Sequence, residues 1–228
     1  MSKEIAEQPE AVQRALAGRV NLVTGGLEMP EIPLTANQIR SINRVIVTGM
    51  GTSLHAGMFG ASVIESLARI PASAENSSEL RYRNPAIDPN TLVIAVTQSG
   101  ETADTLAAME YASERGSAQG AVLEQEGSQA ARIADFTLPI NAGQEIGVAS
   151  TKTMIASMTT LLELAVFLSK SRGVIDADRV RQIVEQLAAL PSLITSTIDR
   201  NSDTSDVAKH LAKSTDLLYL GRGLQLSI

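Results

Sequence analysis

The chain has 228 residues, of which 44% are hydrophobic and 19% charged, so it can bury a core and general disorder is excluded. Its net charge of −6 argues against a broad electrostatic contact with nucleic acid or an anionic membrane, although a helix N-terminus could still bind phosphate. The absence of cysteine excludes disulfides, thiolate metal sites and Cys nucleophiles, and two histidines, His55 and His210, argue against a histidine metal centre.

The N-terminal segment carries Lys3, Glu4, Glu7 and Glu10 and lacks the apolar stretch of a signal peptide. The longest apolar run, residues 154–168, is interrupted by Glu163 and is too short to cross a membrane. We therefore expect a cytoplasmic protein that binds neither nucleic acid nor membrane.

Strands and helices are expected to alternate along the first three-quarters of the chain. Residues 1–40 predict a helical lead-in, with one helix over 4–19. Apolar, β-branched runs predict buried strands over residues 44–49, 91–97, 119–124 and 136–140, with a weaker candidate at 71–75. Helical stretches lie between them, at 53–69, 102–115, 128–133 and 149–168. This alternation predicts an α/β fold, a parallel sheet with helices on both faces.

The chain changes character after Gly173. Two helices are expected, over 176–190 and 193–210, with Pro191 between them. The run LLYLGRG at 217–223 then has the form of VIVTGMG at 45–51, and the first glycines of the two runs are 172 positions apart. We expect the first strand of a second α/β unit there, so that the chain divides into segments 1–40, 41–172, 173–214 and 215–228.

Hydroxyl side chains gather in the loops that follow the first two strong strands. In the first loop, Gly51 permits a tight turn and Thr52 and Ser53 open a helix, an arrangement that suits an anion. A dinucleotide fingerprint would need Gly or Ala where Leu54 stands, and no Gly-Lys-Ser/Thr phosphate loop occurs. Both of these nucleotide-binding interpretations are therefore rejected.

The second loop supplies Thr97, Gln98, Ser99 and Thr102 around Gly100. Helix capping would account for one such hydroxyl but does not need three. In open α/β sheets, ligands bind at the carboxyl ends of the strands, so the two loops together predict a site for a small phosphorylated, polyhydroxylated molecule.

A third loop, residues 143–152, leads into the long apolar helix. Val148, Ala149 and Ser150 could close the same pocket, or Ser150 or Thr151 could simply cap the helix. Two titratable residues nearby also have alternative interpretations. His55 is expected to be a partly buried packing residue, and Glu101 either a general base or a carboxylate placed in the first turn of a helix.

Four segments resemble one known family: GMGTSLHAG, SSELRYRNP, TQSGETADTL and AGQEIGVASTKT. They are similar to the sugar isomerase (SIS) domain, in particular to the isomerase half of glutamine–fructose-6-phosphate aminotransferases. The resemblance implies a flavodoxin-like fold without a nucleotide, metal or other cofactor, and a site for a hexose 6-phosphate. The substrate-binding residues it implies are Gly51, Thr52, Ser53, Thr97, Gln98, Ser99, Thr102, Val148, Ala149 and Ser150.

The resemblance also implies what the chain lacks. The family's full enzyme begins with a glutaminase domain that uses an N-terminal Cys, and its acid–base and Schiff-base residues lie in a second SIS domain and the C-terminal tail. We therefore expect no catalytic residue in this chain and an incomplete isomerase whose second SIS domain is truncated. Alternatives are a stand-alone SIS isomerase or deaminase completed by a homodimer or a complementing subunit, and a non-enzymatic sensor of sugar phosphate.

Overall fold

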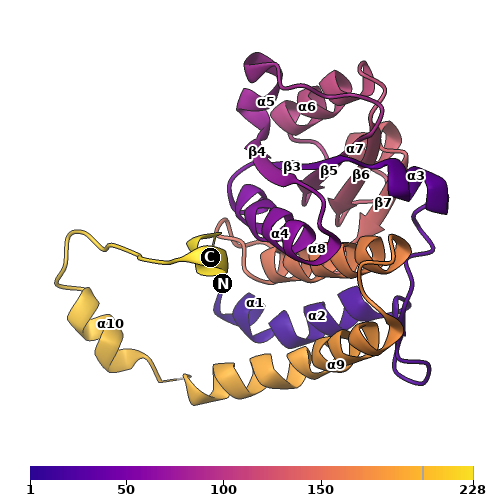
Figure 1. The fold of residues 1–228 in the computed structure, drawn as a ribbon. Coiled ribbons are helices and arrows are strands. Elements are labelled where there is room, and N and C mark those ends of the chain that lie inside the picture. Colours follow the sequence, from indigo (N-terminus) through magenta and orange to yellow (C-terminus); the bar gives the residue numbers. More distant parts are fainter. Residues whose placement is uncertain (202, 228) are drawn as a thin grey trace.

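The computed structural model describes residues 1–201 and 203–227, which include a five-stranded parallel sheet (Figure 1). The strands run in the order β4-β3-β5-β6-β7, so the second strand lies outside the first and the other three follow on the opposite side. This is the flavodoxin-like order, and it confirms the expected fold. The strand bounds are β3 Arg44–Gly49, β4 Ala72–Asn76, β5 Thr91–Thr97, β6 Ala118–Leu123 and β7 Phe136–Pro139.

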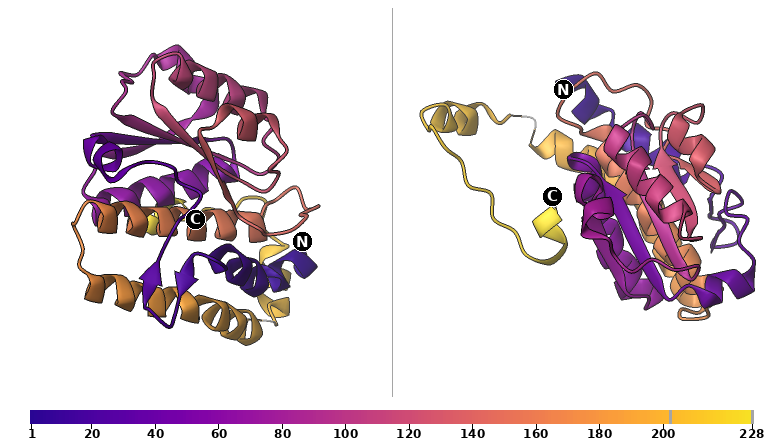
Figure 2. Two further views of the ribbon diagram at one scale, coloured as in Figure 1. Left: turned by 90° about the vertical axis from the view of Figure 1, so that its right-hand side faces the viewer. Right: turned by 90° about the horizontal axis from the view of Figure 1, so that it is seen from above.

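Helices cover both faces of the sheet (Figures 1 and 2). Because successive side chains of a strand point to opposite faces, Ile46 and Val93 pack with α5 and α6, whereas Val47 and Ile94 belong to the cluster formed with α4 and α8. The helix bounds are α4 Thr52–Ala68, α5 Ser77–Arg83, α6 Ala103–Ser113, α7 Gln129–Ile133 and α8 Lys152–Ser171. The short helix α5 was not expected, since its sequence is polar and lacks a long apolar stripe.

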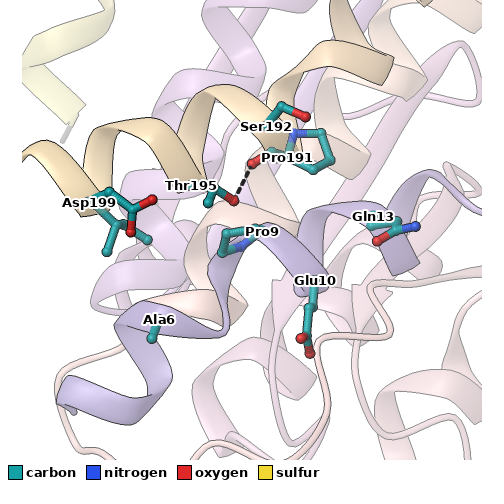
Figure 3. A pocket seen from close by; sticks show the side chains of 9 residues that line it. Ala6, Pro9, Glu10, Gln13, Pro191, Ser192, Thr195 and Asp199 are labelled. Atoms are coloured by element: carbon teal, nitrogen blue, oxygen red, sulfur yellow. Dashed lines mark hydrogen bonds between the residues drawn. The ribbon is translucent and has the colours of Figure 1, made fainter.

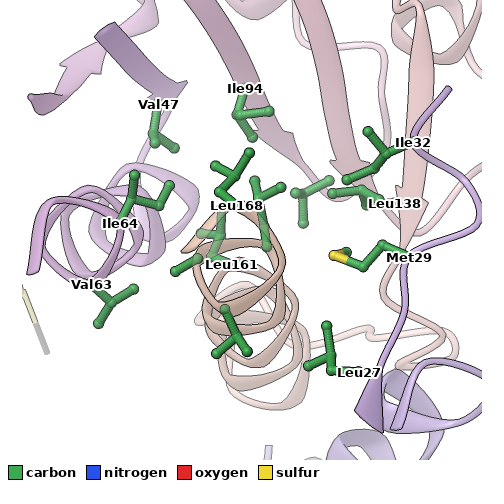
Figure 4. Packing of buried hydrophobic residues seen from close by; sticks show 14 of the residues in the cluster. Leu27, Met29, Ile32, Val47, Val63, Ile64, Ile94, Leu138, Leu161 and Leu168 are labelled. Carbon is green, nitrogen blue, oxygen red and sulfur yellow. The ribbon is translucent and has the colours of Figure 1, made fainter. Parts of the chain in front are cut away.

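Helix α8 is the centre of the larger core. Leu161 and Leu168 are completely buried and lie among Val47, Ile64 and Ile94 (Figure 4). The expectation that the apolar run at 154–168 is too short to cross a membrane is corrected: it is part of the 20-residue helix α8, which by length and composition could cross one. However, 72% of its most apolar stretch is buried inside the fold. It is therefore a core helix of the α/β body.

The N-terminal segment adds a further layer beyond α8. It contains α1 Ser2–Ala6, α2 Gln8–Leu16, a small hairpin of β1 Val20–Asn21 and β2 Gly26–Leu27, and α3 Ala36–Ser41. Helix α2 packs against both α8 and the long helix α9, Ala177–Arg200 (Figure 1). The single helix expected over residues 4–19 is thus wrong: Pro9 lies in the first turn of α2, a position that proline favours because its missing N–H has no helical partner there.

Two expectations for the C-terminal quarter are also corrected. Helix α9 continues through Pro191 rather than stopping there, and Leu190 and Ile194 both pack against the core on either side of it. This packing offsets the one helical hydrogen bond that proline cannot donate.

The strand expected near 217–220 is not formed in the described part of the chain. After α10, Ser205–Leu211, residues 216–222 have no regular structure and residues Gly223–Ser227 form the 3-10 turn η1. A strand needs a neighbour to pair its backbone groups, and Figure 2 shows this segment away from the sheet. Ser202, within the helix expected over 193–210, and Ile228 lie outside the described residues.

Candidate functional site

The first loop presents the N-terminus of α4 at the carboxyl end of β3. Gly51 is the N-cap residue, with φ of +54°, and it offers no side chain to cap the helix. Thr52 and Ser53 are the first two residues of α4. The positive end of the helix dipole and two hydroxyls therefore face the same edge of the sheet, which favours an anion there.

The second loop is built by its own hydroxyls. Thr97 Oγ1 accepts a hydrogen bond from the Gly100 N–H at 3.2 Å, and Ser99 Oγ accepts one from the Glu101 N–H at 3.2 Å. Thr102 is the N-cap residue of α6 but makes no side-chain capping bond. Because a hydroxyl that accepts can still donate, Thr97 and Ser99 can shape the turn and donate to a ligand at the same time.

Replacement of Gly100 by alanine is expected to destabilise the protein by about 1–3 kcal/mol, because its φ of +68° strains any L side chain. A Cβ there would also clash with the side chain of Ser128, whose hydroxyl caps α7. Urea unfolding measures the effect. Gly127→Ala is the matched control, since a Cβ at that position meets nothing within 4 Å; equal stabilities of the two variants would contradict the prediction.

Glu145 organises the third loop and the start of α8. Its Oε1 accepts from the Thr151 N–H at 2.8 Å and from the Lys152 N–H at 3.0 Å, and its Oε2 accepts from Ser150 Oγ at 3.0 Å and from Thr153 Oγ1. Partial burial acts to raise the pKa of Glu145, but these hydrogen bonds outweigh it and lower the pKa below its usual value. Thr151 is the N-cap residue of α8, as one interpretation expected, but neither its side chain nor that of Ser150 makes the capping bond. The carboxylate of Glu145 caps the helix instead, and α8 begins at Lys152 rather than at 149.

The three loops enclose two adjoining cavities, of about 170 and 90 Å³, that share Ser53 and Gln98. We call them together the strand-end groove. It brings together the expected residues Thr52, Ser53, Thr97, Gln98, Ser99, Thr102, Val148 and Ser150. Gly51 and Ala149 do not line it; Gly51 acts through the turn and Ala149 is exposed beside it.

Further residues line the groove that sequence reasoning missed: Met50, Val96, Thr105, Gly147, Thr153, Met154 and Ser157. Ser150, Thr153, Met154 and Ser157 follow the three-and-four spacing of one helix face, a signal that could have revealed the last three. Larger cavities, of about 370 and 450 Å³, lie between the N-terminal helices and α9 (Figure 3 shows the first). Those are spaces between helices, away from the strand ends where open α/β sheets bind ligands.

The two titratable residues considered from the sequence do not line the groove. His55 is exposed on α4, so its expected role as a partly buried packing residue is wrong. Glu101 Oε1 accepts from the Gln129 N–H at 2.9 Å and so anchors the start of α7. Within residues 1–201 and 203–227, only hydroxyl, amide, thioether, apolar and backbone groups line the groove, and no cluster of three metal-ligating side chains occurs.

The fold and the groove define an α/β protein of the flavodoxin-like class with a polar, uncharged groove at its strand ends. The chain belongs to the SIS domain family, which matches residues 38–168. It is 41% identical over 224 residues to a glutamine–fructose-6-phosphate aminotransferase [isomerizing] of Caulobacter vibrioides, and 40% identical over 228 residues to one of Symbiobacterium thermophilum. The alignments cover 98% and 100% of this chain but only 36% and 37% of those relatives.

The C-terminal domain of glucosamine-fructose-6-phosphate aminotransferase from Francisella tularensis has the same fold over nearly the whole chain. The TM-score is 0.91 at 27% sequence identity, and the match covers 98% of this chain and 62% of that one. The sequence resemblance to SIS domains of this type is therefore confirmed.

Proposed function

We propose that the strand-end groove binds a hexose 6-phosphate, with fructose 6-phosphate or glucosamine 6-phosphate as the natural ligand, in an isomerase of the aminotransferase type. The observation that carries this proposal is the convergence of two helix N-termini and several hydroxyls on one uncharged groove. The names of the relatives from Caulobacter vibrioides and Symbiobacterium thermophilum, which include fructose 6-phosphate, support the choice of ligand.

The two halves of the groove suggest a division of labour. The phosphate would occupy the cavity between α4 and α6, where Ser53, Ser99 and Thr102 donate to its oxygens. The sugar would extend into the cavity beside the third loop, lined by Val148 and Ser150. Gln98 lines both cavities, so its amide can bind where phosphate and sugar meet.

The chain would supply binding and leave proton transfer to other groups. Conversion between aldose and ketose needs a base near C1 and C2 and an acid at the ring oxygen. The described lining of the groove offers neither. We therefore propose that these groups come from a second SIS unit, a complementing subunit or a second copy, within a cytoplasmic enzyme in which residues 41–172 form the first SIS domain.

Calorimetric titration of the purified chain tests the ligand. Fructose 6-phosphate should bind and fructose should not. The double variant Ser99→Ala/Thr102→Val should weaken binding at least tenfold, since a hydrogen bond to a charged group contributes about 1.5–3 kcal/mol. Ser196→Ala, on the exposed face of α9, is the control and should bind like the parent. Equal heats from fructose and its phosphate, or none from either, would refute the proposal.

A second candidate, a sensor that binds sugar phosphate without chemistry, is favoured by the same uncharged lining. Turnover separates the two. The chain is incubated with fructose 6-phosphate and ammonia, either by itself or together with a separately expressed second SIS unit. If the isomerase proposal holds, glucosamine 6-phosphate should form only when the second SIS unit is present. Binding without product in both cases would favour the sensor, whereas rapid turnover by the chain alone would show that it is catalytically complete.

A further inference from the structure

We infer that the helix pair α1–α2 supports the ligand site from outside the groove, and that Glu4 is a positioning residue that holds the groove wall at residues 146–148, of which Gly147 and Val148 line the cavity. The inference rests on the proposed function of the groove, since it assigns a role in ligand binding to that wall. The helix pair and the wall are at least 130 positions apart in the sequence.

Glu4 makes the direct contact. Its side chain is almost fully buried, and Oε1 accepts hydrogen bonds from the Ile146 N–H at 2.7 Å and the Gly147 N–H at 3.0 Å. The hydrogen bond from the Gly147 N–H is the largest cause that lowers the pKa of Glu4, to about 2. The carboxylate is therefore charged at neutral pH. A Cβ on Gly147 would lie 2.6 Å from Glu4 Oε2, so glycine is what permits this close approach.

Two more residues of the N-terminal segment, Glu7 between the helices and Arg14 on α2, make contacts that flank the wall. Glu7 Oε2 pairs with the ammonium of Lys152 at 2.7 Å, at the first residue of α8. Arg14 donates from Nε to the Asn141 carbonyl at 2.7 Å and from Nη2 to the Ala142 carbonyl at 2.8 Å. The N-terminal segment therefore holds the third loop just before its beginning, in its middle and at its end.

Other carboxylates hold the neighbouring parts of the loop but not this wall. Glu124 accepts from the N–H groups of Ala142 and Gly143, and Glu145 holds residues 150–153. Between these anchors, the hydrogen bonds described for residues 146–148 both end on Glu4. Val148 is fully exposed, so its place in the groove depends on the residues beside it rather than on packing of its own side chain.

The variants Glu4→Ala and Glu4→Gln test the inference. The alanine removes the acceptor, whereas the amide oxygen of glutamine can still accept from both N–H groups. We expect Glu4→Ala to weaken fructose 6-phosphate binding at least fivefold and to speed amide hydrogen exchange at Ile146 and Gly147. Glu4→Gln keeps a weaker, uncharged acceptor, so both measurements should fall between the parent and Glu4→Ala. Glu185→Ala, an exposed control on α9, should stay within about twofold of the parent.

Each outcome has one interpretation. Unchanged exchange at residues 146 and 147 in Glu4→Ala, or unchanged affinity despite faster exchange, overturns the positioning role. Absence of binding by the parent protein overturns the proposed function instead. If Glu4→Ala does not fold, Gly147→Ala displaces the Glu4 carboxylate from the loop side and should speed amide exchange at Ile146. Because Gly147 itself lines the groove, exchange rather than affinity decides for this variant, and parental exchange at Ile146 would overturn the inference as well.

Discussion

Replacement of Arg19 by methionine is expected to lower the free energy of unfolding by about 3–5 kcal/mol at pH 8, the usual cost of leaving a buried charge without its partner. Arg19 is buried where the lead-in segment meets α8. Its guanidinium contacts Glu163 at 3.0 Å, Glu31 at 2.8 Å and the carbonyl of Pro139 at 3.0 Å. Methionine keeps much of the side chain's length but none of its donors.

A double-mutant cycle in urea checks this prediction. In Arg19→Met/Glu163→Gln the buried carboxylate is gone, so part of the lost stability should return and the two effects should be clearly non-additive. The matched control is Arg179→Met, at an exposed position of α9, which should change stability by less than about 0.5 kcal/mol. If Arg19→Met lowers the free energy of unfolding as little as the control does, the pair of Arg19 and Glu163 contributes little to stability.

The stability of the protein is expected to fall as the pH rises from 5 to 8, because of Glu163. This side chain is completely buried, and burial raises its pKa to about 7 despite the opposing effect of Arg19. The folded state therefore holds a proton that the unfolded chain has already released above its ordinary pKa of 4.5. This stabilisation is complete when the pH is below the pKa of Glu163 in the unfolded chain. It is lost as the pH rises through the pKa of Glu163 in the folded protein, and the total loss of stability is up to about 3 kcal/mol.

Unfolding in urea at several pH values measures this slope, and Glu163→Gln should remove most of it. The pH range from 5 to 8 lies above the range in which Glu4, Glu7 and Glu145 titrate. The pKa values of these three residues are lowered, so their contributions to stability are lost only in more acidic solution. A Glu163→Gln variant with the same slope as the parent would assign the pH dependence to other groups.

The sheet could be predicted because its strands are buried on both faces. Val45, Ile46 and Val47 are all fully buried, so the run of β-branched residues carries the strand signal without alternation. Helix α5 and the continuation of α9 through Pro191 could not be predicted in this way. Tertiary packing decides both, and packing depends on residues far away in the sequence.

The groove was only partly predictable for the same reason. Ser53, Gln98 and Ser99 follow strands, and the carboxyl ends of parallel strands meet at one edge, so the sequence order alone brings them together. Thr153 and Ser157 lie inside an apolar helix, where a hydroxyl more often bonds to the preceding turn, as Ser157 does with the Thr153 carbonyl. The contact of Glu4 with Gly147 spans 143 positions and has no local signal.

The irregular segment after α10 has a practical consequence for anyone who handles the chain. Leu218 and Leu220 are 84% and 87% exposed, and no strand in the described residues pairs with the backbone between them. Such an apolar ribbon offers unpaired N–H and C=O groups to identical ribbons on other molecules. We therefore expect this short stretch, rather than the well-packed body, to drive association at high concentration, and lysine at either leucine to reduce it.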